Sequence, residues 1–405
     1  MRASLHGGSL ARFGHESTHG STQLRESAYS LPVAHDILTG LPRRTAPHQA
    51  VRRHDVIGAV EGTLADFLAG RIAGLDGLDP ALGGFARTAR DLVLAGGKRL
   101  RPTFAYWGWR GAVGPAEPAE AVLPALAALE LMHAFALVHD DVMDDSATRR
   151  GHPTVHRVFA VQHERAGRRG DPVHFGRSSA VLVGDLLLIW ADQLLADAPL
   201  APATLLAARA CYDRMRAEAV AGQYLDVLGE AEPQNWSVER ALRVARHKTA
   251  GYTVRHPLQF GLALAGPAGA DATSEAYHRF GVAVGEAFQL RDDLLGVYGD
   301  PAVTGKPAGD DLRTGKPTVL LMLARQLASP AQRAALDRSH GPARDAAEVD
   351  RLARVIAATG AVARVEGLIR HRVAEGVAAL ADAPIHPDAR AALTGLAVTA
   401  TDRPS

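Results

Sequence analysis

Residues 130–151 read ELMHAFALVHDDVMDDSATRRG, an apolar run that ends in four aspartates and is followed at once by two arginines. Before the aspartates, apolar residues recur at intervals of three and four positions, which is the spacing of one helix face. We expect a single helix over residues 119–145. Its C-terminal end would carry the carboxylates, and acidic side chains there oppose the helix dipole unless a counter-ion stabilises them.

Similar segments, rich in alanine and leucine, recur along most of the chain. After a first helical pattern from about Asp55, they cover residues near 85–95, 119–139, 178–197, 201–228, 237–265, 272–298, 317–328, 349–381 and 387–398. The alternating Val, Thr and Tyr pattern of strands is nearly absent, as are Asn-Gly hairpin turns. The chain is therefore predicted to be all-α, with one domain over residues 53–400. Two polar stretches, 163–177 and 300–317, are expected to be loops.

The two ends of the chain lack this pattern. Residues 1–52 are rich in Gly, Ser, His and Arg, and we expect them to form a disordered tail. The histidines in this tail match no metal-site spacing, and it has no apolar core of a signal peptide. Residues 401–405 would form a short C-terminal tail.

Composition argues against several functions. The 405-residue chain has 45 Lys and Arg against 44 Asp and Glu, so no overall positive field favours a nucleic acid as partner. Cys211 is the only cysteine and cannot form a disulfide within the chain, which suits the cytoplasm. The most apolar stretch, SSAVLVGDLLLIWADQLL, has Asp185 in its middle and falls short of the ~18 uninterrupted apolar residues of a membrane helix. We expect a cytoplasmic protein without stable membrane insertion.

The aspartates at 140–145 suit a metal ion. Asp140 and Asp144 are four residues apart and share a helix face, with Asp141 about 100° round the helix from Asp140. Carboxylates this close repel one another. A solvated acidic helix end is the simpler interpretation, but a divalent cation would relieve the repulsion. Mg²⁺ is the best candidate, because it binds one or two carboxylates together with substrate phosphates.

A second acidic pair, Asp292 and Asp293, again ends an apolar helical run and has Gln289 on the same side. Two helices that each present such a pair can face each other and hold a cluster of Mg²⁺ ions. Basic residues fall in five short clusters: GGKRLRP (96–102), TRR (148–150), KT (248–249) and TGKP twice (304–307 and 314–317). Three of them contain glycines, which allow a ligand close to the backbone. Together they indicate a site for diphosphate groups.

In this order, GGKRLRP, DDVMD with TRRG, GQYLD (222–226), KT, FQLRDD and GKPAGDDLRTGK resemble the motifs of the trans-isoprenyl diphosphate synthases, over residues 55–400. The chain is most similar to bacterial geranylgeranyl diphosphate synthases. The resemblance implies a single large bundle of the isoprenoid synthase type around a central apolar cavity, and a homodimer. It also implies a Mg²⁺-dependent prenyltransferase that condenses isopentenyl diphosphate with allylic diphosphates (dimethylallyl, geranyl, farnesyl). Geranylgeranyl diphosphate (C20) would be the main product.

Three alternatives remain open. A farnesyl (C15) or longer polyprenyl product would change only the length of the tail. A class I terpene cyclase shares the DDxxD motif but lacks a segment like GGKRLRP. A non-catalytic regulatory subunit would be inactive alone and change the product of a partner.

The resemblance also implies a role for individual residues. The expected metal ligands, for about three Mg²⁺ ions, are Asp140, Asp141, Asp144, Asp292 and Asp293. The expected contacts of the allylic diphosphate are Arg149, Lys248, Lys306 and Lys316. The pocket for isopentenyl diphosphate would be formed by Lys98, Arg101, His133 and Arg150. The polar pair near the metal ions is Gln223 and Asp226, and the groups beside the reacting carbons are Thr249 and Gln289. His133 also lies seven residues before Asp140, on nearly the same helix face, although a buried core histidine is the simpler interpretation of its position.

Product length would depend on the floor of the tail pocket. The resemblance locates this floor one to two turns before Asp140, at Met132, Phe135 and Ala136. Ala136 shares a helix face with Asp140 and lies about 6 Å below it. One aromatic and one small residue together indicate a C20 product.

One position departs from the family pattern. The second motif reads DDLLG, with Gly296 where a third aspartate normally stands. Asp300 is too distant to replace it directly, and Asp311 rather than Asp310 matches the family's loop aspartate. If the lost carboxylate limits metal binding, Gly296→Asp should lower the Mg²⁺ requirement.

Overall fold

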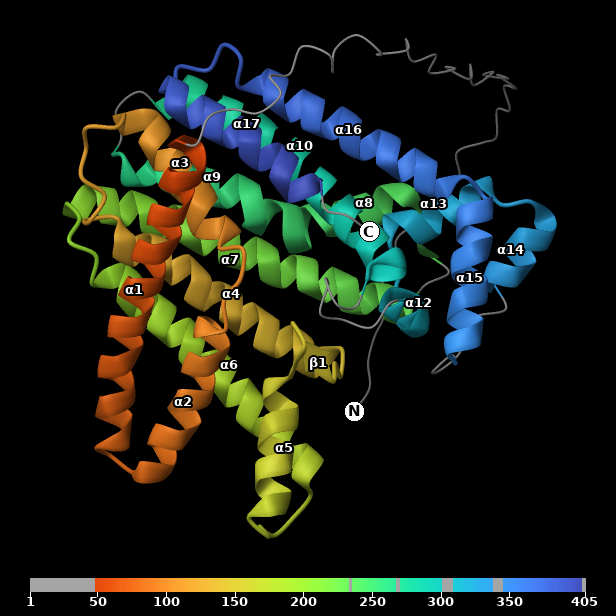
Figure 1. The fold of residues 1–405 in the computed structure, drawn as a ribbon, viewed down its shortest axis with the longest axis horizontal. Coiled ribbons are helices and arrows are strands. Elements are labelled where there is room, and N and C mark those ends of the chain that lie inside the picture. Colours follow the sequence, from red (N-terminus) through yellow and green to blue (C-terminus); the bar gives the residue numbers. More distant parts are fainter. Residues whose placement is uncertain (1–47, 233–234, 267–269, 301–308, 338–344, 403–405) are drawn as a thin grey trace, which may run out of the picture. The chain divides into compact units, whose positions relative to one another are not determined.

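The computed structural model describes residues 48–232, 235–266, 270–300, 309–337 and 345–402. Most of them are helical, so the predicted all-α class is confirmed (Figure 1). In chain order, the elements are α1 (His48–Asp76), α2 (Pro80–Leu94), α3 (Leu100–Val113), α4 (Leu123–Met143), β1 (Thr148–Arg149), β2 (His152–Pro153), α5 (Val155–Arg165), α6 (Pro172–Ala196), α7 (Pro202–Ala231), α8 (Val238–Ala245), the π-helix η2 (Arg246–Arg255), α9 (His256–Leu264), α10 (Ala270–Tyr298), α12 (Asp310–Thr314), α13 (Val319–Leu327), α14 (Pro330–Asp337), α15 (Ala346–Ala358), α16 (Ala361–Ala379) and α17 (Pro387–Thr401). Residues 1–47, most of the expected tail, lie outside the described part, as do residues 403–405.

Helix α6 begins earlier than the sequence predicted. The carboxylate of Asp171 accepts hydrogen bonds from the backbone N–H groups of Val173 (3.0 Å) and His174 (3.2 Å), and Pro172 occupies the first turn. An aspartate followed by proline is a favourable helix start. The expected loop at 163–177 is therefore wrong at both ends, and residues 166–171 connect α5 to α6.

Helix α3 was not among the predicted segments. Most of its side chains are buried, including Phe104, Trp107 and Trp109. A helix that is buried on most sides has no polar face, so its sequence lacks the amphipathic period on which the prediction relied. The preceding residue, Arg99, has a left-handed backbone (φ 46°) that turns the chain into the helix.

Two other segments were predicted as continuous helices but are divided. Residues 237–265 form α8, η2 and α9, and the middle piece has the wider turns of a π-helix, a geometry often found at functional sites. Residues 349–381 are divided by Gly360 (φ 84°) into α15 and α16. Glycine favours this left-handed conformation at a helix end. The expected loop at 300–317 contains the short helix α12.

The helices pack so that two of them carry the acidic motifs toward one cavity. Helix α4 packs against α1, α3 and α6, and its apolar residues Leu126, Leu129 and Leu131 are fully buried. Helix α10 packs against η2, α16 and α17, and η2 packs against α7. The C-terminal ends of α4 and α10 thus both reach the region beside η2.

Two helices, α4 and α6, are long and apolar enough to span a membrane by length and composition alone. Buried residues make up 56% of the most apolar window in α4 and 44% of that in α6. Since core helices of soluble proteins also meet this criterion, the observation is only weak evidence for a membrane segment.

Candidate active site

A cavity of about 2020 Å³ brings most of the predicted residues together. This exceeds the ~300–1,000 Å³ of an ordinary small-molecule pocket, so it has room for two substrates. The predicted residues that line it are Lys98, Arg101, Met132, His133, Phe135, Ala136, Asp140, Asp144, Arg149, Arg150, Gln223, Asp226, Lys248, Thr249, Gln289, Asp292, Asp293 and Lys316. Asp141 does not line it, and Lys306 lies outside the described residues.

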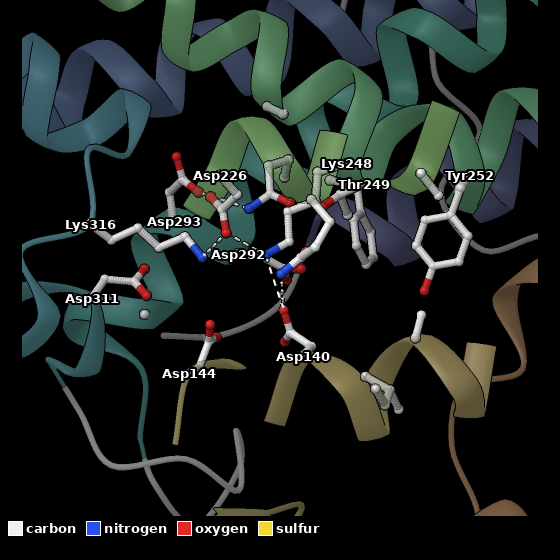
Figure 2. Close-up of a pocket in the computed structure, with 18 of the residues that line it drawn as sticks. Asp140, Asp144, Asp226, Lys248, Thr249, Tyr252, Asp292, Asp293, Asp311 and Lys316 are labelled. Atoms are coloured by element: carbon white, nitrogen blue, oxygen red, sulfur yellow. Dashed lines mark hydrogen bonds and ion pairs between the residues drawn. The ribbon is translucent and has the colours of Figure 1, made fainter. Parts of the chain in front are cut away.

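The aspartates of the first motif differ in their surroundings. Asp140 and Asp144 point into the cavity from the end of α4 (Figure 2). Asp141 is buried and instead accepts a hydrogen bond from Nε of Arg149 (2.8 Å), whose Nη2 also contacts Oδ2 of Asp140 (3.2 Å). Burial, followed by the charge of Asp140, raises the pKa of Asp144. Asp141 therefore holds the Arg149 guanidinium and does not line the cavity.

A short β-hairpin brings Arg149 back beside Asp140 and Asp141 of the first motif. Strands β1 and β2 pair antiparallel, with Arg149 opposite His152, and the two turn residues Arg150 and Gly151 both have positive φ (53° and 76°). Positive φ at both positions is typical of a type I′ turn, whose twist matches that of the paired strands. The guanidinium of Arg150 donates to the backbone carbonyl of Gly96, which links this hairpin to the GGKRLRP segment.

The π-helix η2 supplies a lysine that faces the first motif, and helix α7 supplies a carboxylate, Asp226, that pairs with it. Nζ of Lys248 lies 3.1 Å from Oδ1 of Asp140 and also pairs with Asp226 (Figure 2). Gly222 permits this approach, because a Cβ at that position would lie 2.6 Å from Cα of Lys248. Lys316 also pairs with Asp226, at 2.7 Å. Burial alone would raise the pKa of Asp226, but the two lysines hold it below its usual value.

The second aspartate motif is partly buried. Asp293 accepts hydrogen bonds from Nε2 of Gln289 (2.9 Å) and from the backbone N–H of Val319 (3.1 Å), and thereby joins α10 to the start of α13. Burial, opposed by the Gln289 hydrogen bond, raises the pKa of Asp293 to about 7. Asp292 lines the cavity beside it.

A separate group surrounds His133, and it includes Tyr252, which the sequence analysis missed. Nδ1 of His133 lies 2.6 Å from the Tyr252 hydroxyl, and the Arg101 guanidinium stacks 3.9 Å from the centre of the Tyr252 ring. Nη2 of Arg101 also donates to Thr253 (2.9 Å). Burial and then Arg101 lower the pKa of His133 well below its usual value, whereas burial raises that of Tyr252 to about 12. Both groups are therefore neutral near pH 7, beside a fixed cation.

Arg99 is a second missed residue, and it holds the GGKRLRP segment in place. Its side chain is buried and contacts Glu130 (Nη1–Oε2, 2.9 Å), Glu61 (Nε–Oε1, 3.1 Å) and the carbonyl of Val93 (2.8 Å). Its sequence position between Lys98 and Arg101 looks like one more phosphate contact. Only its left-handed backbone and its buried partners show that it positions those neighbours instead.

The expected floor residues all line the cavity. Met132 is almost completely buried, and the Phe135 ring packs edge-on against His139 with ring centres 4.8 Å apart. His139 in turn packs against Gly184 of α6, where a Cβ would overlap its ring. His139 thus supports the Phe135 ring, and the small Ala136 leaves space in the cavity beside that ring.

The donor groups suit Mg²⁺. Among the described residues, no three carboxylate, histidine or cysteine side chains converge into a ready-made metal site. Mg²⁺ does not require one, because it binds one or two protein carboxylates, several waters and substrate phosphate oxygens. Asp140, Asp144 and Asp292 present carboxylates to a cavity that also holds cations for phosphate, which is the arrangement such shared coordination needs.

The cavity has strong charge at one end and apolar α4 side chains further in. The substrate that complements it is strongly anionic at its head and apolar along its length. The fold and the site therefore define a helical enzyme of isoprenyl diphosphate chemistry.

Comparison with known proteins identifies the family. A family model described as polyprenyl synthetase matches residues 84–359, and the chain belongs to this family of trans-prenyltransferases. The structure resembles that of a Corynebacterium glutamicum geranylgeranyl pyrophosphate synthase complexed with isoprenyl diphosphate and magnesium. The TM-score is 0.82 at 41% identity, covering 86% of this chain and 99% of that one.

Curated relatives agree on the family but differ in product. A geranylgeranyl diphosphate synthase of Mycobacterium tuberculosis is 36% identical over 270 residues, covering 65% of this chain and 70% of the relative. A geranylfarnesyl diphosphate synthase of Aeropyrum pernix is 34% identical over 287 residues, covering 70% and 82%. The family membership is therefore established, and the product length is not fixed by similarity.

Proposed function

We propose that this chain is a Mg²⁺-dependent, chain-elongating geranylgeranyl diphosphate synthase. It would condense isopentenyl diphosphate with dimethylallyl, geranyl or farnesyl diphosphate and release diphosphate. The observation that carries the proposal is the ion-pair contact of Asp140 with both Arg149 and Lys248 in a cavity that is also lined by apolar side chains of α4. One end of that cavity can take up a charged leaving group while the rest holds the tail.

The proposed roles follow from the position of each group. Bound Mg²⁺ would neutralise charge on the departing diphosphate. Arg149, Lys248 and Lys316 surround the same position with fixed positive charge, which stabilises the leaving group as the allylic C–O bond breaks and its electron pair stays on oxygen. Arg101, Lys98 and Arg150 would bind isopentenyl diphosphate beside the neutral His133 and Tyr252.

Carbon–carbon bond formation needs only positioning and a dry pocket. The double bond of isopentenyl diphosphate attacks the allylic carbocation, and the proton lost next passes to the released diphosphate. Thr249 and Gln289 lie along this part of the cavity, although Gln289 also holds Asp293. The apolar side chains of α4 would protect the cation from water.

The C20 product is supported by the floor residues. Phe135 is held by His139, while Ala136 leaves room for a longer tail than two aromatic residues would allow. A C15 product is the runner-up.

The proposal includes a cytoplasmic homodimer. Helices α6 and α7 both leave large apolar side chains exposed, including Leu182 (58% exposed) and Leu206 (71% exposed), and a second copy could cover them. Cys211 is buried and unpaired, which suits a reducing compartment. Sedimentation equilibrium of the full chain tests the dimer, and a monomer at micromolar concentration would contradict it.

Product sizing tests the function. The purified chain is incubated with Mg²⁺, labelled isopentenyl diphosphate and each allylic starter, and the dephosphorylated products are separated by chromatography. We expect a main C20 product, a shorter one for Ala136→Phe and a longer one for Phe135→Ala, with Ala136→Ser as the unchanged control. No consumption of isopentenyl diphosphate would refute the proposed activity. A product of C30 or longer would refute the chain length alone, and unchanged products in both variants would refute the floor.

A further inference from the structure

The π-helix η2 begins and ends at an arginine, and each arginine pairs with a glutamate of a different neighbouring helix. Arg246, the first residue of η2, donates through Nε to the carboxylate of Glu286 on α10. Arg255, the last residue, donates through Nη2 to the carboxylate of Glu218 on α7. The two ends of η2 are thus attached to α10 and α7, both of which pack against it.

Glu286 is a fully buried carboxylate between two guanidinium groups. Besides its contact with Arg246, its Oε2 lies 2.9 Å from Nε of Arg372 on α16. A charge buried in this way is stable only while its partners remain, so the contact with Arg246 is costly to break. Glu286 also lies three residues before Gln289, whose amide holds Asp293. The start of η2 is therefore attached to the part of α10 that leads into the second aspartate motif.

Glu218 attaches the other end of η2. Its Oε2 contacts Arg255 and lies 2.8 Å from Nε2 of His256, the first residue of α9. Burial alone would raise the pKa of Glu218, but the hydrogen bond of His256 and the charge of Arg255 hold it below its usual value. The charged carboxylate thus joins the end of η2 and the start of α9 to α7.

The middle of η2 leaves no space beside these two helices. A Cβ on Gly285 of α10 would lie 2.7 Å from the carbonyl oxygen of Ala250, and one on Gly222 of α7 would lie 2.6 Å from Cα of Lys248. Close-packed interiors transmit small displacements. A shift at either end of η2 is therefore passed to the side chains next to that end.

The half of η2 that follows Arg246 belongs to the proposed allylic site. Lys248 and Thr249 lie two and three residues after Arg246, and both line the cavity. Nζ of Lys248 lies 3.1 Å from Oδ1 of Asp140, where the departing diphosphate is proposed to bind. The position of this half thus decides where the cation for the leaving group stands.

The half of η2 that precedes Arg255 belongs to the proposed pocket for isopentenyl diphosphate. The hydroxyl of Tyr252 lies 2.6 Å from Nδ1 of His133, and the Tyr252 ring stacks on the Arg101 guanidinium. The hydroxyl of Thr253 accepts a hydrogen bond from Arg101 (2.9 Å). The position of this half thus decides how Arg101 and His133 are presented to the second substrate.

We propose that Glu286 and Glu218 are positioning residues that hold the two ends of η2 for different substrates. Glu286 aligns Lys248 for the allylic diphosphate. Glu218 aligns Tyr252, and with it the pocket for isopentenyl diphosphate. Neither glutamate lines the cavity, so each acts through the π-helix and not on a substrate. The inference rests on the proposed prenyltransferase function and assigns two further residues to it.

Steady-state kinetics with Mg²⁺, farnesyl diphosphate and isopentenyl diphosphate separate the two roles. Glu286→Gln keeps the size of the side chain and removes its charge. It should lower kcat and raise KM for farnesyl diphosphate by about tenfold, as expected for a displaced catalytic group, with KM for isopentenyl diphosphate within about twofold of the wild type. Glu218→Gln should do the reverse and raise KM for isopentenyl diphosphate alone by about tenfold. A loss of stability without a positioning role would not divide the two substrates in this way.

Two variants serve as matched controls. Glu366→Gln weakens another contact between α16 and α10, because Glu366 pairs with Arg291 (2.6 Å) instead of η2. Asp192→Asn weakens another contact of α7, because Asp192 pairs with Arg216 (2.8 Å). Both KM values should stay within about twofold of the wild type in these controls.

Binding without turnover separates this inference from the proposed function. Isothermal titration calorimetry measures isopentenyl diphosphate alone, and inorganic diphosphate with Mg²⁺. Glu218→Gln should weaken the first ligand and Glu286→Gln the second, each by about tenfold. A wild type that does not consume isopentenyl diphosphate counts against the proposed function, and the calorimetric comparison then still decides about the two glutamates.

Equal effects of the two variants on both ligands, or effects no larger than those of the controls, would overturn the inference. If Glu286→Gln does not fold in thermal melts, Arg246→Gln replaces it. That change breaks the same ion pair from its partly exposed side and leaves Glu286 paired with Arg372. It should impair the allylic site in the same way, and unchanged kinetics in Arg246→Gln would contradict the role of Glu286.

Discussion

The two aspartate motifs have similar sequences but different surroundings. At the end of α4, the first motif turns Asp140 and Asp144 into the cavity and pairs Asp140 with Arg149 and Lys248. At the end of α10, Asp293 is buried and binds the backbone of α13. The first motif therefore mainly contributes charge to the cavity, whereas the second also connects α10 to α13.

The two motifs also differ in their neighbours. The end of α10 is in contact with α12 and α13, and α12 brings a further carboxylate, that of Asp311, close to Gly296. The end of α4 is followed by the hairpin that carries Arg149, which contributes positive charge instead.

The largest effect is expected at the first motif. Asp140→Ala should lower turnover by about 10²–10³-fold, because it removes a carboxylate proposed to hold the Mg²⁺ that neutralises the leaving group. Chelation with EDTA should abolish activity reversibly. Steady-state kinetics with farnesyl and isopentenyl diphosphates measure both effects, and full turnover in EDTA would contradict the mechanism.

Substitutions of the lysines and arginines should fall into two groups, according to which of the two diphosphates each residue is proposed to bind. Lys98→Ala and Arg101→Ala should raise KM for isopentenyl diphosphate by about 10–100-fold, the cost of a lost charged hydrogen bond. Lys248→Ala, which removes a contact of Asp140, should mainly lower kcat and weaken the allylic site. Each variant serves as the control of the other. Equal effects on both substrates would contradict the assignment.

The second motif should show its structural role in stability. Asp293→Ala leaves the Val319 N–H buried without its acceptor, which should lower the free energy of unfolding by about 1–3 kcal/mol. Asp144→Ala, at the first motif, should change it by less than about 0.5 kcal/mol, since that carboxylate is partly exposed. Urea unfolding of both variants measures the difference. If Asp144→Ala is the more destabilising change, the contrast between the motifs is wrong.

The smallest expected effect is the contribution of the neutral His133 side chain, on α4, to the pH dependence of stability. The folded pKa of His133 lies below its unfolded value, so the unfolded chain binds more protons once the pH falls below about 6.5. His133 therefore lowers stability as the pH falls from 7.5 to 5.5, by about 1 kcal/mol at pH 6, and His156 and His256 act in the same direction. Asp293, whose folded pKa of about 7 lies above its unfolded value, acts in the opposite direction. His133→Gln should lose only the His133 contribution, so urea unfolding of this variant and the wild type should differ more at pH 5.5 than at pH 7.5.

Local motifs predicted the site better than they predicted the helices around it. Motifs such as DDVMD and GGKRLRP identified side chains that line the cavity, because their chemistry is encoded in the residues themselves. The contacts of Asp141, Arg99 and Tyr252 could not be predicted from the sequence, since they depend on which atoms lie close together in the fold. The roles expected of the individual site residues, Lys306 among them, stay predictions.

The fold prediction failed where burial hid the helical period. Helix α3 has apolar residues on most sides, and the π-helix η2 has no period that a 3.6-residue repeat would reveal. The relation between Gly296 and Asp311, 15 residues apart, depends on how α12 packs against α10. The sequence shows the missing aspartate but not the carboxylate that lies beside this position.

The ion pairs of Lys248 and Arg149 with the aspartates have a further consequence. Because these charges already neutralise one another, a metal ion that takes Asp140 releases Lys248, and a diphosphate that takes Lys248 releases Asp140. Binding of either ligand thus releases the side chain that the other ligand needs. Their affinities must then be raised by the same factor in either order of addition. We expect Mg²⁺ and diphosphate to bind weakly alone and tightly together, with the protein's own salt bridges as the exchanged partners.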